Sequence, residues 1–109
     1  MRLCIPIALA LGALLTAAQI GAARAEDMSA GRKKAVQCQA CHGLDGKAKV
    51  PDAPNLAGQN EQYLAKALGD YKSGARQNDM MSLIAPKLSD QDIADLAAYY
   101  AGLPAVSGG

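Results

Sequence analysis

The chain has 109 residues, of which 11 are basic and 10 acidic, and its only aromatic side chains are four tyrosines. Such balanced charge excludes a dedicated nucleic-acid binder with a strongly basic face. The length excludes two large domains, a Rossmann enzyme or a barrel. So small a chain usually needs a disulfide, metal, cofactor or partner to complete its core.

The N-terminus has the pattern of a secretory signal peptide. Arg2 precedes an uncharged run from Leu3 to Ile20, and the small residues Ala23 and Ala25 that follow the run form a cleavage site. We therefore expect residues 1–25 to be removed before Glu26, leaving residues 26–109 as one exported domain. An uncleaved anchor is the alternative, because the run is at the lower limit for spanning a bilayer. The mature chain carries a charge near −1, and Asp90, Asp92 and Asp95 are expected on a solvated helix face.

Residues from about Met28 to Cys41 contain no proline and predict a first helix that Gly43 ends. Within it, Cys38, Cys41 and His42 form a C-x-x-C-H run, the attachment sequence of c-type haem. Residues three apart on a helix face the same side, so both sulfurs can reach one edge of a porphyrin. The next residue, a histidine, can then ligate the iron.

Three other interpretations of these cysteines fit less well. A thioredoxin-like redox pair needs a βαβ context, and no segment alternates with the period of a strand. A structural zinc site needs four ligands, whereas the mature chain has two cysteines and one histidine. A plain disulfide leaves His42 without a role. The sequence therefore predicts one covalent haem c.

Glycines and prolines from Leu44 to Gly58 predict a loop. Asn60 then caps a helix to about Lys72, and Pro86 interrupts the segment that follows. Ser89 starts the last helix, with Asp92 placed for a capping box. Its apolar stripe is Ile93, Leu96, Ala97 and Tyr100. The sequence thus predicts an all-α domain of about four to five helices around the haem.

The second axial position has several candidates in the mature chain. Met28 lies on the same helix as the cysteines and is poorly placed to reach the opposite face. Met80 and Met81 follow a helix that can wrap the ring edge, so either thioether can fold onto the distal side. His/Met ligation raises the reduction potential and saturates the iron, which suits electron transfer rather than catalysis.

Taken together, these motifs resemble those of the class I c-type cytochromes, in particular the small bacterial monohaem cytochromes of the cytochrome c4 and cytochrome c-553 type. The likeness covers nearly all of residues 30 to 103. The matching stretches are Cys38–Gly43, Pro54–Gln59, Arg76–Met81 and Leu88–Tyr100. The resemblance implies the cytochrome c fold and an exported, periplasmic carrier of single electrons that is not an enzyme.

The resemblance also implies roles for individual residues. Cys38 and Cys41 become the thioether anchors and His42 the proximal ligand, with the carbonyl of Pro54 accepting a hydrogen bond from its far ring nitrogen. Met81 is favoured as the distal ligand, with Met80 as the fallback, because the family's methionine precedes the Leu-Ser-Asp start of the last helix by seven positions.

Two groups of packing residues follow from the same resemblance. The first and last helices are expected to cross near Gly31, with Leu96 and Tyr99 against its backbone. Arg76 is expected to be an exposed loop cation rather than a partner of a haem propionate. The expected haem-pocket wall comprises Leu56, Tyr63, Leu68, Tyr71, Leu83, Ile84 and Leu88.

For partners, we expect a membrane cytochrome complex or a dehydrogenase as electron donor and an oxidase or reductase as acceptor. Nucleic acid is not expected, a membrane is approached only through partners, and the protein is a monomer or weak homodimer. The alternative function is a haem c relay subunit of a periplasmic dehydrogenase or a sulfur-oxidising complex.

Overall fold

The computed structural model describes residues 28–107, and the expected signal peptide lies outside them. Residues 28–35 form an α-helix that continues into the 3-10 turn η1 (Val36–Cys38) and then α2 (Gln39–His42). The remaining elements are α3 (Glu61–Ser73), α4 (Met81–Ile84), η2 (Ala85–Lys87) and α5 (Asp90–Ala101). Among these residues there is no strand, which confirms the all-α prediction, and no helix long and apolar enough to cross a membrane.

The first helix differs in detail from the sequence prediction. Instead of one continuous α-helix, the 3-10 turn η1 separates residues 28–35 from α2. Short 3-10 pieces of this kind are frequent near helix ends. Gly43, with φ 74°, ends α2 as predicted, because a residue with a side chain rarely adopts that conformation.

The predicted caps of the two long helices are confirmed. The side chain of Asn60 accepts a hydrogen bond from Tyr63 N at 2.9 Å and begins α3. At the start of α5, Ser89 Oγ accepts from Asp92 N at 3.0 Å, and an Asp92 carboxylate oxygen accepts from Ser89 N at 2.9 Å. This reciprocal pair is a capping box, which satisfies two N–H groups that the helix itself leaves without partners.

The core lies mainly between α3 and α5. The predicted apolar stripe of α5 is buried, and the rings of Tyr99 and Tyr100 meet edge to face with centroids 5.2 Å apart. The buried residues of this core are Ala35, Leu64, Leu88, Ile93, Leu96, Ala97, Tyr99 and Tyr100.

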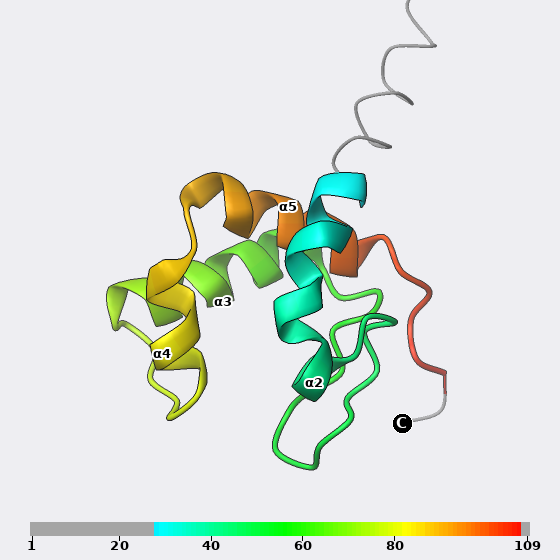
Figure 1. Cartoon of the computed structure of the whole chain (residues 1–109), viewed down its shortest axis with the longest axis horizontal. Coiled ribbons are helices and arrows are strands. Elements are labelled where there is room, and N and C mark those ends of the chain that lie inside the picture. Colours follow the sequence, from blue (N-terminus) through cyan, green and yellow to red (C-terminus); the bar gives the residue numbers. More distant parts are fainter. Residues whose placement is uncertain (1–27, 108–109) are drawn as a thin grey trace, which may run out of the picture.

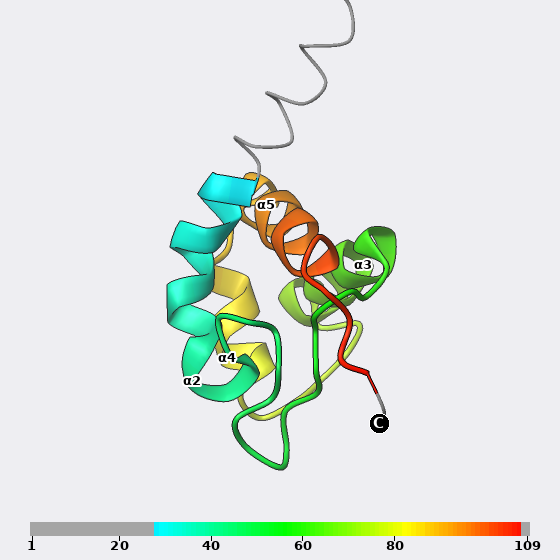
Figure 2. The same cartoon turned by 90° about the vertical axis from the view of Figure 1, so that its right-hand side faces the viewer.

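Residues 28–35 cross α5, as both views show (Figures 1 and 2). Gly31 is buried at the crossing, where an added Cβ would lie 2.5 Å from Tyr99 Cβ and still closer to the carbonyl oxygen of Asp95. The glycine therefore permits an approach that any larger residue would prevent.

Asp95 corrects one prediction, because its side chain is buried rather than solvated, with 5% of its surface exposed. Lys34, from the crossing helix, forms an ion pair with it, and Gln91 Nε2 donates to its second oxygen at 2.8 Å. Lys34 also contacts Asp92 at 2.9 Å. A buried carboxylate is tolerated when a cation and hydrogen bonds accompany it, so this network joins the two crossing helices.

Candidate functional site

The single histidine of the chain lies at the end of α2 in a defined orientation. His42 Nδ1 lies 3.0 Å from the carbonyl oxygen of Pro54. A carbonyl oxygen can only accept, so the ring proton belongs on Nδ1 and the lone pair of Nε2 remains free. An imidazole held in this way is prepared to ligate a metal through Nε2.

Both described cysteines precede this histidine closely and are free thiols. Cys38 ends η1 and Cys41 lies in α2, and both are partly exposed. Burial raises the pKa of the Cys38 thiol. Two thiols and an imidazole are thus presented within five consecutive residues of one helical segment.

Two tyrosines of α5 donate hydrogen bonds to the backbone that follows His42. Tyr99 OH donates to the carbonyl of Leu44 at 2.6 Å, and Tyr100 OH donates to that of Gly43 at 3.3 Å. Burial raises the pKa of Tyr100, so its hydroxyl stays protonated and remains a donor. The backbone that follows His42 is therefore fixed by two side chains of α5.

The predicted methionine pair lies at the start of α4. Met81 is the first residue of α4 and is half-buried, whereas Met80 is 57% exposed. The two short helices α2 and α4 lie in the lower part of the molecule in Figure 1, with α3 and α5 above them.

The residues expected to form an apolar wall differ in burial. Leu88 is 4% exposed and belongs to the core, while Leu56 and Leu68 are partly buried and pack against it. Ile84 and Tyr71 are half-buried, and Tyr63 and Leu83 are 50% and 66% exposed. Arg76 lies in an exposed loop, as expected, with its guanidinium 4.8 Å from the centre of the Tyr71 ring.

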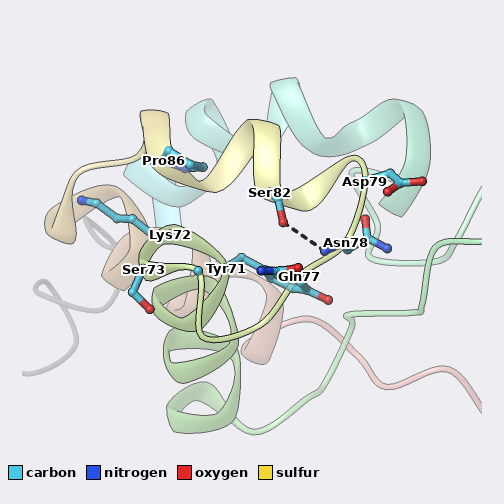
Figure 3. Close-up of a pocket in the computed structure, with 9 residues that line it drawn as sticks. Tyr71, Lys72, Ser73, Gln77, Asn78, Asp79, Ser82 and Pro86 are labelled. Carbon is cyan, nitrogen blue, oxygen red and sulfur yellow. Dashed lines mark hydrogen bonds between the residues drawn. The ribbon is translucent and has the colours of Figure 1, made fainter.

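A separate open pocket lies between the end of α3, the following loop and α4 (Figure 3). Its lining is largely polar and includes Lys72, Asn78 and Ser82. Tyr71 of the expected haem-pocket wall also borders it, whereas Cys38, Cys41, His42 and Met81 do not.

Sequence reasoning missed Asn78, whose side chain caps α4 and contacts the backbone of both methionines. Asparagine before a helix is a common cap, but α4 has only four residues. A helix that short has no periodic pattern by which its start could be located.

The donor chemistry decides what this site can hold. Residues 28–107 contain no group of three or more His, Cys, Asp or Glu side chains that could bind a metal ion. The adjacent thiols and oriented imidazole instead fit a group tethered through two sulfurs and ligated by one nitrogen. Fold and site together define an all-helical protein that attaches haem covalently.

Comparison with known proteins agrees with this class. The sequence pattern of the family described as Cytochrome c matches residues 28–103, so the chain belongs to the cytochrome c family. Cytochrome c4 of Pseudomonas aeruginosa is 49% identical over 89 residues, which are 81% of this chain and 44% of that protein. Cytochrome c-554(548) of Halomonas halodenitrificans is 46% identical over 79 residues, which are 70% of this chain and 95% of that protein.

A solved structure is similar as well. The crystal structure of reduced recombinant cytochrome c4 from Pseudomonas stutzeri matches with a TM-score of 0.66 at 41% identity, covering 71% of this chain and 45% of that chain. A protein named thiosulfate dehydrogenase electron acceptor, from Thiomonas intermedia, is 41% identical over 104 residues, 94% of this chain and 48% of that protein. The chain spans about half the length of the cytochromes c4 it matches.

Membership of the family confirms the predicted fold and cofactor. A cytochrome c carries haem, and the C-x-x-C-H run is the sequence at which c-type haem is attached. The cofactor of this chain is therefore one covalent haem c with its iron.

Proposed function

We propose that this protein is a carrier of single electrons that cycles between Fe(III) and Fe(II) at a haem c ligated by His42 and Met81. The observation that carries the proposal is the hydrogen bond from His42 Nδ1 to Pro54 O, 3.0 Å long, which leaves Nε2 free to ligate a metal. A carbonyl acceptor behind a ligating histidine fixes its orientation and increases its basicity. Cys38 and Cys41 are the thioether anchors in this proposal.

Burial supports Met81 rather than Met80 as the distal ligand. A thioether bound to an iron inside the domain has to turn away from solvent, and Met81 is half-buried while Met80 is 57% exposed. With both axial positions filled by side chains, the iron has no open position for a substrate. This arrangement favours electron transfer over catalysis.

The apolar side chains near these residues have a matching role. Leu56, Leu68 and Ile84 are partly buried, and Tyr63 and Leu83 are exposed although they are large and apolar. Each 100 Å² of apolar surface removed from water contributes about 2.5 kcal/mol. Enclosure of a haem by such residues would therefore stabilise the domain substantially.

Visible spectroscopy of the holoprotein during a redox titration tests the proposal. We expect one haem per chain, a six-coordinate ferric state and a Met-to-iron charge-transfer band. Met81→Ala should abolish the band, and the adjacent Met80→Ala, a matched control, should retain it. Retention of the band in Met81→Ala would show that Met81 is not the ligand.

We propose the periplasm as the location, because residues 1–25 have the features of a signal peptide. N-terminal sequencing of the exported protein should begin at Glu26. An intact Met1 would contradict cleavage.

A bound relay subunit is the second candidate function. It is favoured by the 41% identity to the protein named thiosulfate dehydrogenase electron acceptor. Size-exclusion chromatography of a native extract separates the two functions. A diffusible carrier elutes as a monomer or weak homodimer, whereas a relay subunit elutes with a dehydrogenase or sulfur-oxidising partner.

A further inference from the structure

Asn78 holds the backbone of both methionines with one side-chain oxygen. Its Oδ1 accepts hydrogen bonds from Met80 N and Met81 N, each 3.0 Å long. A carboxamide oxygen has two lone pairs and can accept both. One side chain thus satisfies two N–H groups at the beginning of α4 that the helix cannot satisfy itself.

The contact is reinforced from within α4. Asn78 N donates to Ser82 Oγ at 3.0 Å, the bond drawn in Figure 3, and Ser82 N donates to the Asn78 carbonyl at 2.9 Å. Asn78 therefore takes part in four hydrogen bonds with residues 80–82. Together they fix the geometry of the backbone at Met81.

The chain before this point has little packing to hold it. Residues 73–80 are all exposed, and Gly74, with φ 86°, turns the chain out of α3. Arg76 rests on the Tyr71 ring and donates through its backbone N to the carbonyl of Asp70 at 3.1 Å, which secures the first part of the loop. An exposed segment gains conformational entropy when released, so the position of Met81 depends on the hydrogen bonds of Asn78.

We propose that Asn78 is a positioning residue for the axial methionine, holding the backbone of Met81 so that its thioether remains the sixth ligand of the iron. This inference rests on the proposed ligation by Met81. Asn78 itself does not touch the iron. Its effect is on the equilibrium between the ligated methionine and a loop conformation in which an added small ligand can take the same coordination position.

Imidazole titration of the ferric holoprotein measures that equilibrium, with loss of the Met-to-iron charge-transfer band as the readout. In Asn78→Ala we expect imidazole to bind about fivefold more tightly than in the wild type, the effect of losing one typical helix cap. Asn78→Asp keeps an oxygen in the same place and should behave like the wild type.

Asn60→Ala is the matched control. It removes the side chain that caps α3 at Tyr63 N and so lowers stability at a different helix. Its imidazole affinity should equal that of the wild type. An equal increase in Asn60→Ala and Asn78→Ala would attribute the effect to general loss of stability and overturn the inference.

Two further results separate this inference from the proposed function. A wild-type protein without the charge-transfer band would contradict methionine ligation, and both proposals would then fail. A wild-type band together with unchanged imidazole affinity in Asn78→Ala would overturn the positioning role alone. If Asn78→Ala does not assemble, Ser82→Ala removes the acceptor of Asn78 N and should give a smaller increase, and no increase there would also overturn it.

Discussion

Substituting alanine for two helical glycines tests how the terminal helices pack. Gly31 lies in the crossing with α5, where a Cβ would be 2.5 Å from Tyr99 Cβ and nearer still to the Asp95 carbonyl. Gly69 lies within α3, and a Cβ there would meet no atom within 4 Å. The same substitution therefore produces a steric conflict at one site and none at the other.

The two changes should have opposite signs. Alanine in a helix interior is more stable than glycine by about 0.5–1 kcal/mol, so Gly69→Ala should gain that amount. Gly31→Ala makes the same gain but inserts a methyl group against backbone atoms that cannot rotate away, and such overpacking costs about 1–3 kcal/mol. For a domain of this size, about 1 kcal/mol changes Tm by roughly 4–8 °C. We therefore expect Tm to rise by a few degrees in Gly69→Ala and to fall by about 5–10 °C in Gly31→Ala.

Thermal unfolding of the ferric holoprotein, followed by far-ultraviolet circular dichroism, measures both shifts. The charge-transfer band recorded below the transition should be unchanged in both variants, because a Cβ at Gly69 meets no atom within 4 Å and the Gly31 contact lies at the crossing with α5. A Gly31→Ala protein as stable as Gly69→Ala would refute the close contact between the crossing helices.

Three other experiments test the contacts around this crossing and the haem. Lys34 holds the pKa of Asp92 at about 2, so the free energy of urea unfolding should decrease as the pH falls from about 4 toward 2. Lys34→Met should reduce that decrease. Parallel plots of unfolding free energy against pH for the two proteins would contradict the role of the ion pair. Tyr99→Phe removes a partly buried 2.6 Å hydrogen bond and should cost about 1–2 kcal/mol in urea unfolding. This cost should exceed that of Tyr100→Phe, whose bond is 3.3 Å long, and the reverse order would contradict the ranking by distance. Replacing both cysteines of the attachment sequence with alanine should leave a chain with no cooperative thermal transition, because the haem completes the core. A sharp calorimetric peak for this variant would show that the chain folds without haem.

Features coded by neighbouring residues could be predicted from the sequence. The C-x-x-C-H run needs only five consecutive residues to define its chemistry. The caps at Asn60 and Ser89 depend on N–H groups two or three residues away, so residue type and spacing were sufficient. The end of α2 is also determined locally, because the positive φ that stops the helix is a property of Gly43 itself.

Features that depend on distant partners could not be predicted. Asp95 has the position of a solvated charge in its own helix, and only the arrival of Lys34, 61 residues earlier in the chain, makes its burial favourable. The difference in burial between Met80 and Met81, which lie at the junction of the exposed loop and α4, depends on packing against other parts of the chain. Such packing leaves no periodic pattern in a segment of four residues.

The hydrogen bonds from α5 to the backbone after His42 also bear on the order of folding. They join residues 55 and 57 positions apart, and a chain made from its N-terminus presents the attachment sequence long before α5 exists. Until then, Gly43 and Leu44 lack the tyrosines that later restrain them. Docking of α5 is therefore the step that fixes the backbone after His42, and it comes last because the tyrosines lie near the end of the chain.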